Sequence, residues 1–376
     1  MTGNSLTPDK QPQNNLLLKL LCVYWLIAKI IGWRMFTAYR LFPTAPVFES
    51  LDQLPRIVHL IVFLLSLLFI GLTFFFPKNK FILAGLLVTE TLSCLPDQNR
   101  WQPWEYQCIF IVFVFLVNRN RQASIIPLFT FILASTYFYS GCNKLNEGFL
   151  ENVWVQMFLR SFLKIPATVA RQPWLYYCGC LLALFELLGG LGLLFLKTQK
   201  TAAKALILMH LFVLVLLGPF GLNYNAVIWP WNVAMIGYLY IIFLYKNERT
   251  VIFKPPFGGW NKLVFVCWGI LPLLGLFGYW DGFLSSSIYS GKSPRMVICI
   301  RDTSKCPELK PFYNASQIQL CGDGSTGINL QTWGLAETNM ILNPELRVLK
   351  QTKKKLEKKY VAAGLSCTIF IKEKKQ

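Results

Sequence analysis

Nine long apolar stretches follow one another through the first three quarters of the chain, separated by short polar segments. They cover about residues 15–33, 54–76, 80–95, 107–118, 124–140, 175–196, 202–218, 227–245 and 261–278. A membrane-spanning helix needs about 20 consecutive, mainly apolar residues. The pattern predicts an all-α polytopic membrane bundle of about nine transmembrane helices over residues 15–279. The fourth stretch is short, and the preceding "WQPWEYQ" would extend it at the interface, where Trp and Tyr are favoured.

The two ends of the chain differ from this pattern. Residues 1–14 are polar and lack the features of a signal peptide, so we expect a short disordered tail. Residues 280–376 carry short alternating runs, and we expect strands at "RMVICI", "QIQL", "GINLQTW" and "LSCTIFI". The stretch "QTKKKLEKKYVAA" predicts a helix with a basic face. We therefore expect a small α+β domain over 280–376, with a loosely folded tail as the alternative.

Composition supports the membrane class. Hydrophobic residues make up 54% of the 376 residues and aromatic residues 15%, and the mean hydropathy is +0.45, which is too apolar for a soluble globule. A net charge of +19 would suggest nucleic acid in a soluble chain. Here the Lys and Arg residues lie in short loops and in a C-terminal cluster. We expect membrane lipid as a partner and no nucleic acid.

The loop charges predict an orientation. The loops "PKNK", "NRNR", "KTQKTAAK" and "YKNERTVIFK" alternate with "LPDQNRWQPWEYQ" and "GPFGLNYN", which carry one basic residue and none. The positive-inside rule places the first group and the N-terminus in the cytoplasm. Nine helices then put the C-terminal domain outside, in a cell membrane that is the inner membrane if the source is bacterial. The loop from Arg34 to Arg56 and the segment from Leu145 to Arg171 are basic exceptions.

Cysteine spacing gives no metal motif. Seven of the eleven cysteines lie in or beside apolar stretches, where cysteine behaves as a small hydrophobic residue. The other four, Cys299, Cys306, Cys321 and Cys367, belong to the C-terminal domain. In an oxidising compartment they could form two bridges with three connectivities, and free buried thiols are the alternative.

Three segments rich in polar and aromatic residues fall on the predicted outer face: 95–107, 139–149 and 218–232. The second, "YSGCNKLNEGF", places Lys144 at the end of a membrane helix. A cavity opening outward and lined by such residues is a reasonable binding site. Its candidate cofactor-binding residues are Trp101, Trp104, Tyr106, Trp229, Trp231 and Asn232. The alternative for the aromatic residues is interfacial anchoring.

Ionisable residues inside apolar stretches add candidates, because a charge in hydrocarbon is costly and usually faces a bundle interior or a cavity. Glu186 and His210 lie at similar depths, so a contact between them is allowed, as a functional site or as a structural polar pair. Glu90 and His59 belong to the same outer half. Lys29 is expected to extend to the lipid headgroups.

These residues resemble a known family. "YSGCNKLN", followed by Trp154, resembles the segment G-x-K-K-L-D-x-x-W of the vitamin K-dependent gamma-carboxylase, and "RWQPWEYQ" is similar to its W-N-N-H-x-Y segment. Together they resemble the horizontally transferred transmembrane (HTTM) domain, distantly related to DoxX-like membrane proteins. The resemblance implies that Lys144 is the base that deprotonates a reduced quinone at the outer face. A lysine acts as a base only if its surroundings favour the neutral amine.

The chain departs from the family in two ways. The family's histidine falls on Trp104, and His59 or His210 would have to replace it. The large lumenal substrate-binding domain is also absent, so we do not expect gamma-carboxylation of proteins. What the resemblance leaves is an enzyme acting on a quinone or lipid, with Lys144, His210 and Glu186 as catalytic residues and no metal. The alternative is a non-catalytic membrane scaffold that presents its C-terminal domain to an envelope protein.

Overall fold

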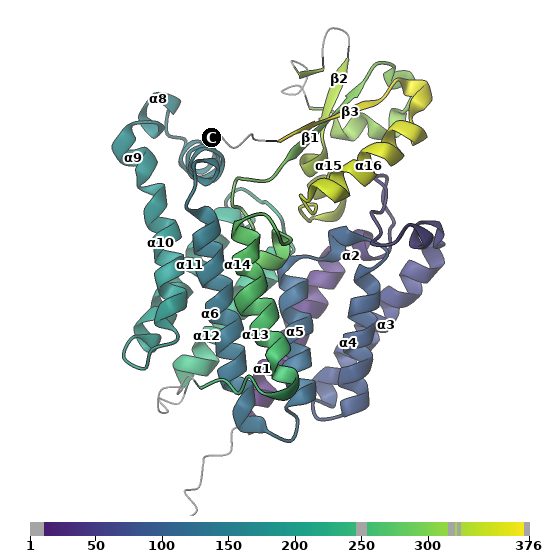
Figure 1. The fold of residues 1–376 in the computed structure, drawn as a ribbon. Coiled ribbons are helices and arrows are strands. Elements are labelled where there is room, and N and C mark those ends of the chain that lie inside the picture. Colours follow the sequence, from purple (N-terminus) through teal and green to yellow (C-terminus); the bar gives the residue numbers. More distant parts are fainter. Residues whose placement is uncertain (1–10, 246–253, 315–319, 322–324, 372–376) are drawn as a thin grey trace, which may run out of the picture.

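All nine predicted stretches are helical in the computed structural model, which describes residues 11–245, 254–314, 320–321 and 325–371 (Figure 1). Eight form one main helix each: α1 (Gln11–Ile31), α3 (Arg56–Phe75), α4 (Lys80–Cys94), α5 (Pro103–Val117), α6 (Ile125–Lys144), α10 (Gly179–Gly192), α11 (Gln199–Leu217) and α12 (Ile228–Phe243). The ninth is divided into α13 (Lys262–Phe265), the π-helix η7 (Val266–Ile270) and α14 (Leu271–Leu276). Residues 11–14, expected in the disordered tail, belong to α1, and α5 does begin within "WQPWEYQ".

Six segments of the described chain are long and apolar enough to cross a membrane. They are Gln11–Ile31, Arg56–Phe75, Gln122–Lys144, Pro173–Gly192, Gln199–Leu217 and Gly259–Leu276. Helices α4, α5 and α12 have 15, 15 and 16 residues and fall short of the usual span. The fold is therefore that of a helical membrane protein, and the prediction of nine spans is not confirmed.

Hydrogen bonds between segments far apart in the sequence show which helix ends lie together. At the end of α1, Ile31 accepts from Asn339 of the C-terminal domain, whereas Asn14 at its start donates to Gln122 just before α6. Asn118 after α5 pairs with Asn261 before α13. We call the end of the bundle that carries the C-terminal domain the domain end, and the opposite end the far end. The three polar segments 95–107, 139–149 and 218–232 all reach the domain end (Figure 1).

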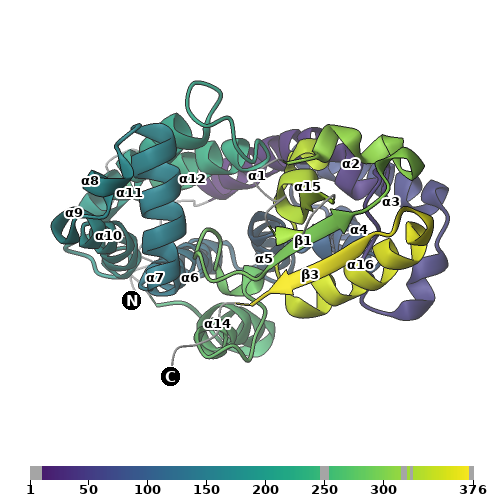
Figure 2. The same cartoon turned by 90° about the horizontal axis from the view of Figure 1, so that it is seen from above.

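Short elements complete the two ends of the bundle. They are α2 (Trp33–Phe36), η1 (Glu49–Gln53), η2 (Gln98–Arg100), η3 (Gln122–Ser124), α7 (Glu147–Phe149), η4 (Leu150–Phe162), α8 (Ala167–Ala170), α9 (Pro173–Tyr177), η6 (Gly259–Asn261) and η8 (Phe283–Ser285). The π-helix η4 crosses the domain end at a steep angle to the bundle helices (Figure 2). Its Trp154 donates to the Leu175 carbonyl, 2.8 Å away, which ties η4 to the start of α9.

Small residues let α6 and α10 approach closely. A Cβ atom on Gly190 of α10 would lie 2.7 Å from the backbone nitrogen of Phe138 and 2.8 Å from the carbonyl oxygen of Ala134. Glycine is therefore required where the two backbones meet, as at many helix contacts in membranes. This contact brings the domain-end halves of both helices, and the polar side chains that they carry, within reach of each other.

The C-terminal domain is the predicted α+β unit, with strand order β2-β1-β3 and both pairs antiparallel. Its elements are β1 (Arg295–Ile300), η9 (Thr303–Lys305), η10 (Pro307–Phe312), β2 (Thr326–Asn329), α15 (Leu330–Thr338), α16 (Leu346–Lys359), η12 (Val361–Ala363) and β3 (Ser366–Phe370). The strand expected through "GINLQTW" ends at Asn329, whose side chain accepts from the backbone of Gln331 and Thr332 and caps α15. Most of "QIQL" lies outside the described residues.

The domain packs over the α2–α5 side of the bundle (Figures 1 and 2). The Gln102 side chain donates to the Ile341 carbonyl at 2.9 Å, and the backbone N–H of Asn343 donates to the Asn99 side chain at 3.1 Å. Leu41 donates its backbone N–H to Glu337. These bonds satisfy loop groups that would otherwise be buried without partners, so the domain and the loops of the domain end form one packed structure.

Candidate functional site

Lys144 lies at the last turn of α6, where its ammonium pairs with the carboxylate of Glu186 from α10. It also donates to Ser140 Oγ, one turn earlier on α6, at 2.9 Å. The side chains of Lys144 and Glu186 are 15% and 10% exposed, so the pair is largely shielded from water. The electrostatic attraction between two charges is stronger in such surroundings than at a surface. Removal of one partner is costly because it leaves the other charge buried without a partner.

His210 of α11 has hydrogen bonds at both ring nitrogens. The amide of Asn232 donates to the Ile228 carbonyl, which leaves its Oδ1 to accept from His210 Nδ1 at 2.7 Å. His210 Nε2 lies 2.7 Å from the Tyr137 hydroxyl. With Nδ1 as a donor, a neutral ring accepts the Tyr137 proton at Nε2. Tyr137, His210 and Asn232 thus form a hydrogen-bonded row across α6, α11 and α12.

The ion pair and this row face one cavity of about 100 Å³. Its lining residues are Thr136, Tyr137, Ser140, Lys144, Glu186, Met209, His210, Val213, Ile228, Trp231, Asn232, Met235, Ser286, Ile288 and Tyr289. Of the predicted site residues, the cavity therefore brings together Lys144, Glu186, His210, Trp231 and Asn232. Glu186 and His210 line the same cavity. Glu186 bonds to Lys144, and His210 bonds to Tyr137 and Asn232.

A larger hollow of about 410 Å³ lies above this cavity, between the bundle and the C-terminal domain. Tyr289 lines both spaces. Its backbone is left-handed, with φ of +55°, and its hydroxyl accepts from Asn225 at 2.8 Å. A non-glycine residue in this region is held there by its surroundings. Tyr289 therefore forms the boundary between the inner cavity and the outer hollow.

The other predicted aromatic residues lie elsewhere. Trp104 is fully buried against Phe36, and Tyr106 stacks on Trp268 at 5.1 Å. Trp101 packs near Tyr106, and Trp229 donates to the Leu217 carbonyl at 2.9 Å. None of these four lines the cavity. Trp101, Trp104 and Tyr106 lie at or just before the start of α5, which packs mainly against α4, α6, α1 and η8. Their positions correspond to packing and anchoring roles.

The position of Lys29 differs from the one expected from the sequence. It was expected to extend to the headgroups, but its side chain is fully buried. Its ammonium donates to Glu90 at 2.6 Å and Glu105 at 2.8 Å and lies 3.8 Å from the Phe36 ring centroid. The second carboxylate oxygen of Glu105 accepts from Trp25, and that of Glu90 accepts from Ser66. The two acidic side chains hold Lys29 inside the bundle because an unpaired carboxylate there would be far more costly.

His59 belongs to this second cluster and not to the cavity, so it does not replace the missing histidine there. Its Nδ1 lies 3.1 Å from the guanidinium of Arg100, which also donates to the Ser93 and Met35 carbonyls. Arg40 pairs with Asp97 close by. The cluster as a whole holds three basic and three acidic buried residues: Lys29, Arg40, Arg100, Glu90, Asp97 and Glu105. Its formal charge is therefore balanced.

Three of the cavity residues that were not predicted from the sequence contribute hydroxyl groups to the interactions described above: Tyr137, Ser140 and Tyr289. The first two precede Lys144 by seven and four residues, a spacing that places all three on one helix face, so a helical projection would have found them. Nothing in the local sequence marks Tyr289, which reaches the site through the fold of the loop after η8.

Among the described residues there is no group of three His, Cys, Asp or Glu side chains that could hold a metal ion. The cavity instead offers an amine, a carboxylate, a phenol and an imidazole within a partly apolar wall. Such a set can move protons to and from a small polar group. No family model, curated protein or solved structure matches this chain, so its resemblance to the carboxylase-like membrane module stays a prediction that rests on the short motifs.

Proposed function

We propose that this protein is an integral membrane enzyme that takes a proton from a hydroxyl of a membrane-borne substrate of the quinol type at the domain end of the bundle. The observation that carries the proposal is the convergence of Lys144, Glu186 and His210, from three helices, on one cavity. The Tyr137 and Trp231 rings and the side chains of Met209 and Met235 give this cavity walls suited to a ring. The resemblance to the HTTM and carboxylase-like proteins supports the same substrate class.

The ion pair suggests how the proton moves. Lys144 is the cationic partner of Glu186, whereas a lysine base must be neutral. In our proposal the substrate O–H bond breaks, the proton passes to the Glu186 carboxylate, and the electron pair stays on the substrate oxygen. The Lys144 ammonium stabilises this oxyanion, which is a common use of a fixed positive charge in a shielded site. On the other side of the substrate, the Tyr137 hydroxyl, which donates its proton to His210, offers its oxygen as an acceptor.

Substrate entry requires the cavity to enlarge. At about 100 Å³ it is smaller than the roughly 150 Å³ apolar cavity that holds benzene in an engineered protein. Tyr289 separates it from the outer hollow, and Ser286 in the same loop is also left-handed, with φ of +57°. We propose that displacement of the loop holding Ser286 and Tyr289 admits the ring.

Anaerobic titration of menadiol into nanodisc-embedded protein tests the proposal. A bound quinolate absorbs at longer wavelength than the quinol, so the wild type should develop a quinolate band. Glu186→Gln should bind menadiol without the band, and Lys144→Met should lose the band because the oxyanion has no counter-charge. Lys310→Met, an exposed lysine of the C-terminal domain, is the matched control. A wild type without a quinolate band at saturating menadiol would refute the proposal.

A scaffold function is the second candidate, and one observation favours it. Helix α16 exposes Lys350, Lys354 and Lys358 at four-residue spacing, which forms a basic stripe on the domain surface. Such a stripe suits an acidic envelope partner. In a deletion strain, the triple variant K350E/K354E/K358E should fail to complement if the protein is a scaffold and should complement fully if the cavity carries the function. Glu186→Gln should give the reverse result.

A further inference from the structure

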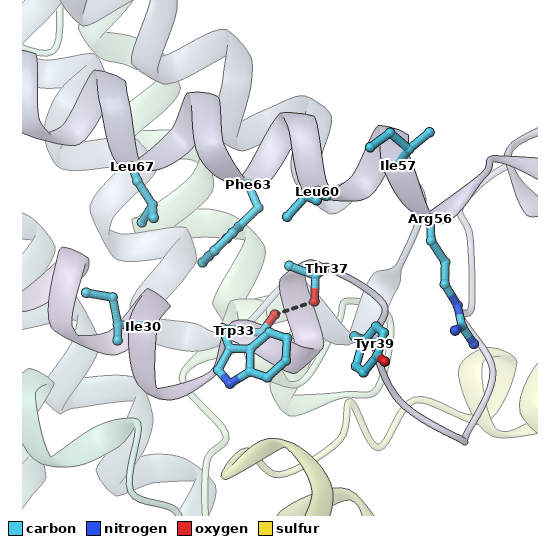
Figure 3. Close-up of a pocket in the computed structure, with 9 residues that line it drawn as sticks. All are labelled: Ile30, Trp33, Thr37, Tyr39, Arg56, Ile57, Leu60, Phe63 and Leu67. Carbon is cyan, nitrogen blue, oxygen red and sulfur yellow. Dashed lines mark hydrogen bonds between the residues drawn. The ribbon is translucent and has the colours of Figure 1, made fainter.

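An apolar groove of about 490 Å³ lies between the end of α1, helix α2 and the first half of α3 (Figure 3). Its lining residues are Ile30, Trp33, Thr37, Tyr39, Arg56, Ile57, Leu60, Phe63 and Leu67. Leu60, Phe63 and Leu67 point from α3 towards Ile30 and Trp33 (Figure 3). The Thr37 hydroxyl is satisfied by the Trp33 carbonyl at 2.9 Å. The groove therefore presents almost only hydrocarbon and ring surface, and it shares no residue with the cavity at Lys144.

The length of the groove matches one membrane leaflet. Its α3 wall runs from Arg56 to Leu67, which at 1.5 Å per residue is about 16 Å. The hydrocarbon core of a bilayer is about 30 Å thick, so one leaflet is about half of that. Arg56 is the first residue of α3 and lies at the domain end, whereas Leu67 lies about midway along the helix. A single acyl chain entering at the domain end would follow the groove to its bottom.

A stack of two aromatic rings with a guanidinium group at each end lies at the mouth. The Arg56 guanidinium carbon is 5.7 Å from the Tyr39 ring centroid, Tyr39 stacks on Trp33 at 5.9 Å, and Arg34 lies 5.6 Å from the Trp33 ring. Trp33 and Tyr39 are 40% and 60% exposed. Rings of this kind are typical of the headgroup level of a membrane.

Both arginines lack a carboxylate partner among the residues that the structure describes. They are also the two ends of the segment from Arg34 to Arg56, a basic exception to the positive-inside pattern. A positive charge beside a lipid-facing apolar groove complements a negatively charged headgroup. Binding an anionic lipid would account for two exposed arginines at a position where the topology rule disfavours them.

We propose that this groove binds one anionic phospholipid from the leaflet at the domain end. One acyl chain occupies the groove between α1 and α3. Arg56, which lines the groove, contacts the phosphate, and Arg34 at the other end of the stack adds to the positive potential. The proposal is independent of any reaction in the cavity at Lys144, and it assigns a second, lipid-specific site to the bundle.

Native mass spectrometry tests the proposal with protein taken from nanodiscs that hold equal amounts of phosphatidylglycerol and phosphatidylcholine. The wild type should retain one phosphatidylglycerol. Arg56→Gln should reduce this preference about fivefold, since one basic residue near an anionic headgroup contributes about that factor, and Arg34→Gln should reduce it less. Arg119→Gln removes the same charge from an exposed residue near the far end and should leave the preference unchanged.

A second pair of variants tests the groove itself. Leu60→Trp fills it, whereas Leu64→Trp places the same side chain on the lipid-exposed surface of α3 outside the groove. Retained phosphatidylglycerol should fall in the first variant only. Equal retention of both lipids by the wild type, an unchanged preference in Arg56→Gln, equal lipid loss in the two Trp variants, or displacement of the lipid by an equimolar uncharged isoprenoid would each overturn the proposal.

Discussion

Gly141 of α6 lies directly against the backbone of α10 at Ala183. A Cβ atom at Gly141 would come within 2.6 Å of the Ala183 carbonyl oxygen and the Leu187 backbone nitrogen. Gly141 is three residues before Lys144, and Ala183 is three residues before Glu186, so this contact sets the distance between the two charged side chains. The missing side chain at Gly141 is thus part of the geometry of the site.

Gly141→Ala should therefore separate α6 from α10 and weaken the ion pair of Lys144 and Glu186. Neither backbone can yield without shifting its helix, so we expect a loss of about 1–3 kcal/mol, the usual cost of overpacking. Gly71→Ala is the control, because a Cβ on Gly71 of α3 meets nothing within 4 Å. Thermal unfolding in detergent should distinguish the two variants, and equal melting temperatures would contradict the proposed role of Gly141.

Exchanging the charges of the ion pair separates a structural role from a catalytic one. The double variant K144E/E186K keeps one amine and one carboxylate between α6 and α10, so its stability should recover most of what each single variant loses. Its function should not recover, because the amine and carboxylate now meet the substrate from exchanged positions. Full complementation of a deletion strain by the double variant would show that the pair serves packing alone.

The bundle could be predicted from the sequence because hydrophobic length is a local property. Each of the nine stretches is helical, and β1 and β3 were found from alternating apolar residues. Lys29 could not be placed in this way. Whether a lysine near a helix end reaches the headgroups or turns inward depends on partners 61 and 76 residues away, Glu90 and Glu105. No local pattern encodes that pairing.

The candidate site was predictable in part for the same reason. Depth along a helix follows from residue counting, which brought Glu186 and His210 to one level. Residue counting along α6 gives depth but not the side of the helix, so depth alone does not place Tyr137 beside Lys144. Trp104 was assigned to the site because its segment lies on the predicted outer face, although it packs on Phe36 away from the cavity. Polar side chains at one end of a bundle can thus belong to two separate clusters.

Lys29→Met should destabilise the protein strongly. It leaves Glu90 and Glu105 buried without their shared counter-charge, and removing one partner of a buried pair costs about 3–5 kcal/mol. The double variant K29M/E105Q should be less destabilised than Lys29→Met alone, because one of the two uncompensated charges is gone. Lys78→Met, at an exposed loop position, should be neutral. The order of melting temperatures in detergent checks this, and a Lys29→Met variant as stable as Lys78→Met would contradict it.

Acid should weaken the loops of the domain end through Asp97. Burial acts to raise the pKa of this carboxyl, but Arg40 and Arg100 together hold it below its ordinary value. A group with a lowered folded pKa contributes stability above its unfolded pKa, about 3.9 for Asp, and the contribution is lost as pH falls through the folded pKa. Melting temperature should therefore decline from about pH 5 downwards.

Asp97→Asn provides the test of that assignment. The variant should be less stable than the wild type at pH 7, and its melting temperature should change less between pH 5 and pH 3. Glu49→Gln alters an exposed carboxylate of η1, in the adjacent loop at the domain end, and should keep the wild-type profile. If Asp97→Asn retains the full wild-type decline, another group causes the loss of stability in acid.

The four cysteines of the C-terminal domain form one bridge and leave two free thiols, which lies between the predicted two bridges and the alternative of free thiols. Cys299 of β1 is bonded to Cys321, whereas Cys306 and Cys367 are buried free thiols. The bridge joins residues 22 positions apart, and closing a loop of about that size stabilises a fold by about 3 kcal/mol in the chain-entropy account. A disulfide persists in an oxidising compartment and is rare in the cytosol, so its state in the cell also reports where the domain lies.

Membranes denatured at harvest in the presence of a thiol-blocking reagent, so that buried free thiols are also blocked, and then reduced and labelled with a polymeric maleimide should show two labelled cysteines in the wild type. The double variant C299S/C321S should show none. Its domain should also unfold at a lower urea concentration, whereas Cys367→Ser, which changes a free thiol, should leave the bridge intact. Complete blocking of all cysteines at harvest in the wild type would mean that the domain faces a reducing compartment and would overturn the predicted orientation.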